Sequence, residues 1–196
     1  MLPPDMRVIS GEFGGRRLEA PKGLKTRPTS DRVREALFMS FGDMTDWTVL
    51  DLFAGSGAQG IEALSRGAAY AHFVDSGRPA LECIAANLRT LGIADRAKVW
   101  PIGLPAGVRK LGAIVEECDL VLADPPYGGQ DARAILAALG ECRFKAGVVV
   151  ALERHQKDEV PSEAGALTLV RERRYGETVV TLYGARPHAP EDGSSS

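Results

Sequence analysis

The spacing of apolar residues changes near position 48, and this change separates two parts of the chain. From Thr48 onward, short apolar runs alternate with longer segments in which apolar positions recur every three or four residues. The short runs favour strands and the longer segments favour helices. Strands that are apolar throughout, such as residues 119–123, are typical of a parallel sheet covered on both faces. The expected strands are residues 48–53, 70–75, 98–102, 119–123 and 147–152, and the expected helices are residues 59–66, 78–91 and 131–139.

The chain ends in two consecutive predicted strands. Residues 167–173 and 178–183 are separated by a break at Tyr175 and Gly176, so we expect an antiparallel hairpin at the edge of the sheet. The alternation before it predicts right-handed crossovers between parallel strands. The sequence therefore predicts an α/β fold with a doubly wound, mostly parallel sheet and an antiparallel C-terminal hairpin. Residues 187–196 are rich in Pro, Gly and Ser and predict a disordered tail.

The N-terminal region precedes this alternation and is basic. Residues 7–19 predict a short β-hairpin around a glycine-rich turn, and residues 31–41 predict a helix that Gly42 ends. Between residues 6 and 34, eight Lys or Arg stand against three Asp or Glu, whereas the whole chain has a net charge of −2. Such an end is typical of a polyanion-binding protein, and a solvated surface hairpin has the same composition. We expect a basic extension over residues 1–28 and one main domain over residues 29–186.

Length and composition exclude several classes of protein. A chain of 196 residues with 44% hydrophobic content suits one globular domain. No apolar run reaches the ~20 residues that a membrane helix needs, and the N-terminus lacks a secretory signal. Its three cysteines do not have the spacing of metal ligands. We therefore expect a cytoplasmic monomer that binds neither a membrane nor a metal.

A glycine-rich loop follows the first predicted strand. Gly55, Gly57 and Gly60 fit G-x-G-x-x-G, and Asp75 ends the next strand, where its carboxylate can accept ribose hydroxyls. Asp51 would repel a pyrophosphate at the following helix N-terminus but suits an ammonium group. This pattern favours S-adenosylmethionine over NAD, although a purely structural turn remains an alternative. The expected cofactor-binding residues are Asp51, Phe53, Ala54, Gly55, Ser56, Gly57, Asp75, Ser76, Gly103 and Leu104.

A second motif, Asp124-Pro125-Pro126-Tyr127, follows the fourth predicted strand. Its two prolines fix an extended turn that presents the Asp124 carboxylate and the Pro125 carbonyl as acceptors for an NH₂ group. Tyr127 offers a flat face on which a base can stack, worth ~1–3 kcal/mol. Acceptors aimed at the hydrogens of an aryl amine localise its lone pair and stabilise the cationic nitrogen of the transition state. We expect these four residues to be catalytic, and a plain Pro-Pro turn is the structural alternative.

Together these motifs resemble those of class I methyltransferases and, more narrowly, of the RsmD family of 16S ribosomal RNA guanine-N2 methyltransferases. The narrower resemblance rests on residues 7–11, 27–35, 53–58 and 124–127, and residues 175–178 fit as well. It implies a seven-stranded sheet with a reversed last strand and S-adenosylmethionine as methyl donor. It also implies a guanine amino group of small-subunit RNA as acceptor, within a 30S subunit or an assembly intermediate. The expected RNA-binding residues are Arg16, Arg17, Lys25, Arg27, Arg32 and Arg34.

Relatives often carry Asn or Asp where this chain has Ile102-Gly103-Leu104, so adenine contacts there would be backbone or apolar. Three other interpretations stay open. The acceptor could be adenine N6 or a protein glutamine amide, although relatives with those substrates often have Asn at the position of Asp124. An NAD-dependent dehydrogenase is disfavoured by Asp51 and by the lack of a His or Lys for a hydride site. A non-catalytic RNA-binding protein is disfavoured by the intact motifs.

Overall fold

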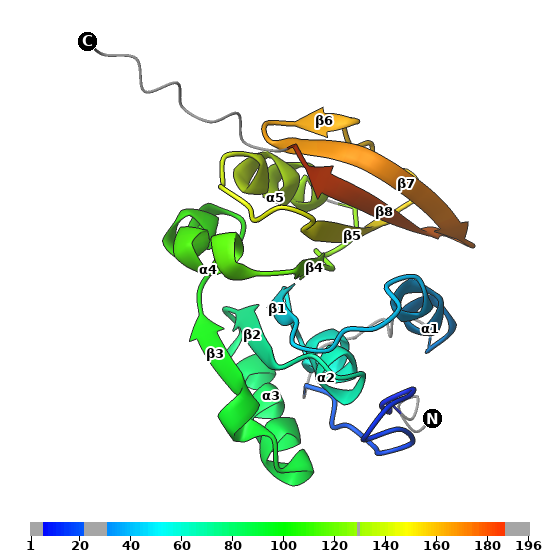
Figure 1. Ribbon diagram of the computed structural model, residues 1–196, viewed down its shortest axis with the longest axis vertical. Coiled ribbons are helices and arrows are strands. Elements are labelled where there is room, and N and C mark those ends of the chain that lie inside the picture. Colours follow the sequence, from blue (N-terminus) through cyan, green and yellow to red (C-terminus); the bar gives the residue numbers. More distant parts are fainter. Residues whose placement is uncertain (1–5, 22–30, 129, 187–196) are drawn as a thin grey trace.

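A single sheet forms the centre of the protein in the computed structural model, which describes residues 6–21, 31–128 and 130–186 (Figure 1). The strand order is β3-β2-β1-β4-β5-β8-β7-β6. Strands β1 to β5 are parallel, whereas β8, β7 and β6 each run antiparallel to the strand before them in that order. The strands are β1 (Thr48–Leu52), β2 (Tyr70–Asp75), β3 (Ala97–Pro101), β4 (Leu120–Ala123), β5 (Val149–His155), β6 (Glu163–Ala164), β7 (Leu167–Tyr175) and β8 (Thr178–Ala185).

This topology confirms the predicted fold class. The sheet has eight strands where seven were expected, because the two-residue strand β6 precedes the C-terminal hairpin. A strand of two residues is too short to show an apolar alternation. The predicted strand 147–152 also continues to His155, and this extension places further polar side chains at the carboxyl end of β5.

Helices cover both faces of the sheet. The side chains of α1, α2 and α3 belong to one buried cluster, and those of η2, α4 and α5 belong to the other. The segment that contains η2 and α4 was not predicted, because its two helices are only six residues long each. No helix among the described residues is long and apolar enough to cross a membrane. The helices are α1 (Asp31–Met39), α2 (Ala58–Ser65), α3 (Arg78–Leu91), η1 (Ala94–Arg96), η2 (Ala106–Leu111), α4 (Gly112–Glu117) and α5 (Asp131–Gly140).

The described part of the N-terminal extension packs on α2 and α3. Arg7 and Arg17 form a single antiparallel bridge, which is the predicted hairpin in its shortest form. Val8, Phe13 and Leu18 are buried in the same cluster as α1, α2 and α3. Burying three apolar side chains contributes roughly 1.5–3 kcal/mol each. The extension therefore contributes to the core of the main domain.

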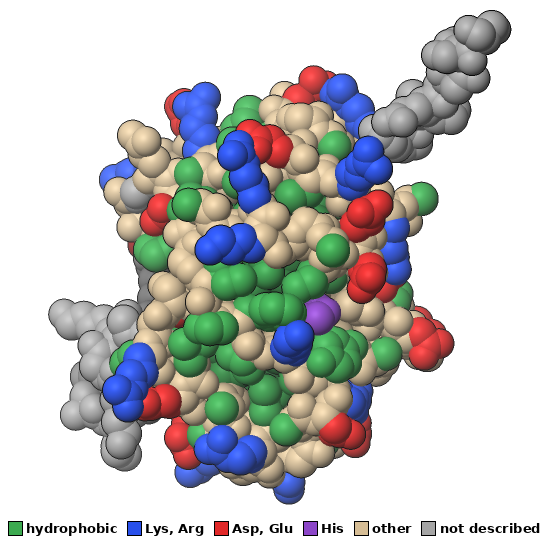
Figure 2. All heavy atoms as spheres, turned by 90° about the vertical axis from the view of Figure 1, so that its left-hand side faces the viewer, with side chains coloured by type: hydrophobic (Ala, Val, Ile, Leu, Met, Phe, Trp, Pro, Cys, Tyr) green, Lys and Arg blue, Asp and Glu red, His purple; other side chains and the backbone are tan. Residues whose placement is uncertain are grey.

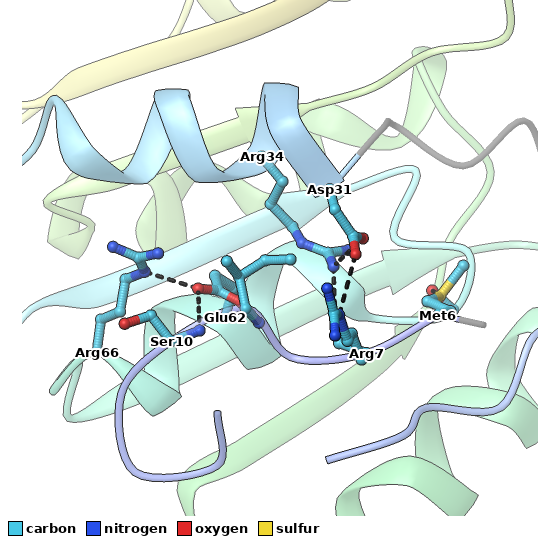
Figure 3. A network of polar contacts seen from close by, with 9 residues as sticks. Met6, Arg7, Ser10, Asp31, Arg34, Glu62 and Arg66 are labelled. Atoms are coloured by element: carbon cyan, nitrogen blue, oxygen red, sulfur yellow. Dashed lines mark hydrogen bonds and ion pairs between the residues drawn. The ribbon is translucent and has the colours of Figure 1, made fainter. Parts of the chain in front are cut away.

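A buried carboxylate on α2 holds this extension in place (Figure 3). Glu62 is fully buried and accepts hydrogen bonds from the backbone of Ile9 at 2.7 Å and of Ser10 at 3.2 Å. It also pairs with Arg66 at 2.7 Å, one turn along the same helix. A buried charge is stable only when such partners satisfy it. The contacts of Glu62 thus fix the extension against the helix that follows the glycine loop.

Candidate active site

Three neighbouring strands bring the two sequence motifs to one edge of the sheet. The glycine loop is tied to β2 by the hydrogen bond from Ala54 N to Val74 O, at 3.0 Å. The second motif is tied to β1 by the hydrogen bond from Asp124 N to Leu52 O, at 3.4 Å. Because β4, β1 and β2 are parallel neighbours, their carboxyl ends carry Asp124, the glycine loop and Asp75 side by side. Ligands of open α/β sheets bind at this edge.

The glycines of the loop have different roles. Gly55 and Gly57 have φ angles of 56° and 80°, in the left-handed region that favours glycine. Phe53 also has a positive φ, 59°, although it carries a side chain, and such strain is concentrated at ligand sites. At Gly60, a Cβ atom would lie 2.4 Å from the Phe73 ring. Gly60 therefore allows α2 to pack closely on β2, while Gly55 and Gly57 shape the loop.

Asp75 is fixed by the loop that it faces. Its two carboxylate oxygens accept hydrogen bonds from Gly55 N at 2.9 Å and from Gly77 N at 2.8 Å. Each carboxylate oxygen can accept a second hydrogen bond, so the fixed side chain can also accept the hydroxyls of a ribose. Ile102 N donates to Asp75 O at 3.1 Å, which places the segment that leads to Gly103 and Leu104 beside this carboxylate.

Asp51 is a buried carboxyl group below the loop. Its side chain accepts a hydrogen bond from Gly60 N at 2.9 Å, and the residue is 2% exposed. Burial raises the pKa of Asp51 to about 8, and the charge of Asp75 raises it further, while the hydrogen bond from Gly60 opposes the shift. A nearby cation would favour the ionised form. The ammonium group of a methionine moiety provides such a cation, so this residue fits S-adenosylmethionine.

Three of the expected cofactor residues have surroundings that the motif does not reveal. The Ser56 hydroxyl donates to the sulfur of Met6 at 3.0 Å, and Ser56 O accepts from Asn87 Nδ2 at 2.9 Å. The Ser56 side chain is thus engaged by the N-terminal extension. Leu104 is half-buried against the cluster beneath α4, and Gly103 is exposed. Both therefore suit the backbone or apolar contacts that we expect for an adenine ring.

The second motif is completed by side chains from β5 and β8. The Tyr127 hydroxyl donates to Glu153 Oε1 at 2.8 Å and lies 3.1 Å from Thr178 Oγ1. The Tyr127 ring also meets the His155 ring edge to face, with 5.8 Å between centroids. Burial and the charge of Glu153 raise the pKa of Tyr127, so its hydroxyl stays protonated and remains a donor. These contacts fix the orientation of the ring on which a base would stack.

The sequence reasoning missed Glu153, His155 and Thr178 as members of the site. The predicted strand ended at Leu152, one residue before Glu153, so the polar residues that follow it were not assigned to the site. Glu153 is 5% exposed although it carries a carboxylate. Two features of the sequence could have indicated these residues: the polar run 153–155 after a buried strand, and the family resemblance at residues 175–178.

The RNA-binding prediction needs one correction. Arg34 is 3% exposed and donates to Arg7 O and to Asp31, so its side chain belongs to the packing of α1 on the extension (Figure 3). Arg32, by contrast, is exposed on α1. Arg16 and Arg17 are exposed on the extension, and Lys25 and Arg27 lie outside the described residues.

Figure 2 shows the face of the molecule that carries β3 and α4. Hydrophobic side chains gather at its centre, and Lys, Arg, Asp and Glu side chains are scattered around them. The positive side chains on this face do not form one continuous basic area. Among the residues that the structure describes, no group of three or more His, Cys, Asp or Glu side chains could hold a metal ion.

Comparisons with known proteins agree with this geometry. A family model described as "Conserved hypothetical protein 95" matches residues 6–184. "Putative rRNA methyltransferase YlbH" of Bacillus subtilis is 38% identical over 184 residues, which are 92% of this chain and 100% of the relative. "Ribosomal RNA small subunit methyltransferase D" of Escherichia coli K12 is 31% identical over 189 residues, which are 95% and 93% of the two chains. The solved structure "Putative methyltransferase yhhF from Escherichia coli" is 33% identical, covers 92% of this chain and 98% of its own, and gives a TM-score of 0.76.

Proposed function

Because the chain belongs to the RsmD family of S-adenosylmethionine-dependent methyltransferases, we propose that it methylates the N2 amino group of a guanine in small-subunit ribosomal RNA. The observation that carries this proposal is that the motif at residues 124–127 follows β4, the neighbour of the strand that leads into the glycine loop, at the same edge of the sheet. Two relatives are named as rRNA methyltransferases, which supports ribosomal RNA as the substrate. Family membership also argues against the NAD-dependent dehydrogenase considered above.

The residues of β1 and β2 would hold the methyl donor. When bound, S-adenosylmethionine supplies a methyl group on a positively charged sulfur, whose bond to that methyl breaks on transfer to leave the neutral thioether S-adenosylhomocysteine. Asp75 would accept hydrogen bonds from the ribose hydroxyls, and the segment from Ile102 to Leu104 would contact the adenine. Asp51 would lie near the ammonium group, whose charge favours the ionised carboxylate.

The residues of β4 would orient the acceptor. The Asp124 carboxylate and the Pro125 carbonyl accept the two hydrogens of the amino group, which directs the nitrogen lone pair toward the methyl group. As the new carbon–nitrogen bond forms, the nitrogen becomes positively charged, and the carboxylate stabilises that charge. The amine then loses one proton, for which Asp124 is the nearest acceptor of this motif. The Tyr127 ring would stack on the guanine, with its hydroxyl held by Glu153.

The test is methylation of 30S subunits and of deproteinised 16S rRNA, both from a strain that lacks the gene. Wild-type protein and the Asp124→Ala variant receive S-adenosylmethionine with a labelled methyl group, and mass spectrometry identifies the modified nucleoside. We expect N2-methylguanosine with the wild-type protein and almost none with the variant. Label on adenine, or on a protein glutamine, would replace the proposal with one of the alternative acceptors.

A further inference from the structure

A groove runs between α1 and the C-terminal hairpin, outside the site described above. Ala36 and Ser40 line it on the side of α1, and Arg171, Arg173 and Tyr175 line it on the side of β7. Leu37 of α1 and two apolar residues of β8 complete its lining, which contains no acidic side chain among the described residues. The lining is therefore mostly apolar, and its two charged residues, Arg171 and Arg173, both belong to the side of β7.

The arginines of this wall differ from the other charged residues of the same strand. Arg171 and Arg173 are exposed, and no hydrogen bond or ion pair of either guanidinium is present within the described part of the chain. Glu172, between them, pairs with Arg154 at 2.6 Å, while Arg174 donates to Gly176 O at 2.9 Å. Alternate residues of a strand point to opposite faces, so the strand directs Arg171 and Arg173 to the groove and Glu172 away from it.

Tyr175, which lines the groove, is also paired with a residue of the acceptor half of the active site. Arg171, Arg173 and Tyr175 pair across the hairpin with Leu182, Val180 and Thr178, and directly paired residues share one face of a sheet. The Thr178 hydroxyl lies 3.1 Å from the Tyr127 hydroxyl. Tyr175 thus pairs directly with Thr178, the residue that contacts Tyr127. Arg171 and Arg173 are about 7 Å apart along the strand, which suits neighbouring phosphates of a nucleic-acid strand.

We propose that the groove between α1 and β7 binds the RNA strand next to the target base, with Arg171 and Arg173 contacting its phosphates. This inference rests on the proposed function, since it assumes an RNA acceptor at Tyr127. The extruded base loses its stacking when it leaves its neighbours, and phosphate contacts beside it offset that loss and fix the register of the strand. The groove adds a second RNA contact to the exposed arginines of the N-terminal extension.

The experiment compares the double variant Arg171→Gln/Arg173→Gln with wild type and with Arg89→Gln/Arg133→Gln. The control removes the same charge from exposed positions on α3 and α5. RNA binding is measured with deproteinised 16S rRNA at several salt concentrations, methylation kinetics with 30S subunits from a strain lacking the gene, and cofactor binding by calorimetry. For the double variant we expect a salt slope smaller by about 1.4–1.8, from two lost contacts of about 0.7–0.9 each. We also expect a KM for RNA raised at least ten-fold, with kcat and cofactor affinity unchanged.

The two proposals fail in different ways. If wild type methylates RNA and the double variant matches the control in salt slope and KM, the groove does not bind RNA and the proposed function stands. If wild type methylates no RNA but the double variant still loses salt slope relative to the control, the groove binds RNA and the proposed activity is wrong. A loss of cofactor affinity in the double variant would show a structural defect and overturn the assignment of these arginines to RNA.

Discussion

The two halves of the active-site edge are built in different ways. The donor half, on β1 and β2, is held mainly by contacts close in sequence or within one β-α-β unit, such as Gly55 N to Asp75 and Gly60 N to Asp51. The acceptor half, on β4, β5 and β8, depends on side chains far apart in sequence, since Tyr127 meets Glu153 and Thr178. None of these four hydrogen bonds joins a side chain of one half to a side chain of the other. Variants in one half should therefore leave the property of the other half unchanged.

The largest expected effect is on the acceptor half. Under the proposed function, Asp124→Ala removes the carboxylate that stabilises the developing positive charge on the amine, so kcat should fall by about 10²–10³. Its cofactor affinity should stay at the wild-type value, because the proposal assigns Asp124 to the acceptor. Single-turnover methylation and calorimetry with S-adenosylhomocysteine measure the two properties separately. If Asp124→Ala lowers kcat and cofactor affinity by the same factor, the two halves of the site are not independent.

The reverse pattern is expected for Asp75→Ala on the donor half. The variant leaves ribose hydroxyls and the Gly55 and Gly77 N–H groups without their acceptor, and charged hydrogen bonds contribute about 1.5–3 kcal/mol each. The dissociation constant of the cofactor should rise by at least about 30-fold, while kcat at saturating cofactor changes little. Calorimetry measures the change, and the Asp75→Asn variant, which keeps one acceptor oxygen and so one of the two loop contacts, should lie between Asp75→Ala and wild type. Equal cofactor affinity in Asp75→Ala and wild type would contradict the assignment of Asp75.

The difference between local contacts in the donor half and distant contacts in the acceptor half also explains which residues of the candidate site the sequence could predict. The donor half follows from a strand, a glycine loop and an acidic residue 20 positions later, so the pattern predicts Asp51, Gly55 and Asp75 together. The topology also followed from apolar periodicity, except for short elements such as β6 and α4. Contacts between residues tens of positions apart leave no local pattern, so Glu153 and Thr178 could not be assigned to Tyr127.

A count of basic residues along the sequence says less about the candidate site than the spacing of the motif residues does. Arg34 lies in the basic stretch that suggested RNA binding, yet the structure buries it against Arg7 O and Asp31. Arg171 and Arg173 lie in a strand with mixed charges and were not among the predicted RNA-binding residues, although they line a groove without acidic side chains. A charge becomes available to a partner only when the fold exposes it and leaves it without an internal counterion.

A smaller effect is expected where Tyr127 meets β5. Tyr127→Phe keeps the stacking ring but removes the hydroxyl that donates to the buried Glu153 carboxylate, so RNA methylation should fall by about ten-fold in kcat/KM. Glu153→Gln keeps an acceptor oxygen for the hydroxyl and should lose less. Steady-state kinetics of both variants, with cofactor affinity as the control for the donor half, test the contact. If Glu153→Gln is the more damaging of the two, Glu153 does more than position the tyrosine.

Asp51 should also make the stability of the protein depend on pH. Burial raises the pKa of Asp51 to about 8 from an ordinary value near 3.8, so the folded apoprotein holds a proton that the unfolded chain loses between these values. Wild type should therefore lose stability as pH rises from about 5 to 8, whereas Asp51→Asn should not. The variant keeps an oxygen to accept from Gly60 N. Thermal melts of both proteins across this pH range measure the difference.

Cofactor binding should change in the opposite direction over the same range. The ammonium group favours ionised Asp51, whose population in the apoprotein grows about five-fold between pH 7 and pH 8 for a pKa of about 8. The wild-type affinity should therefore rise by up to that factor relative to Asp51→Asn, and taking this ratio cancels the titration of the ligand itself. Calorimetry at both pH values measures it, and Asp124→Asn, on the acceptor half, should follow wild type. A ratio that does not change with pH would place the ammonium group away from Asp51, because an ionised carboxylate beside it must couple the two charges.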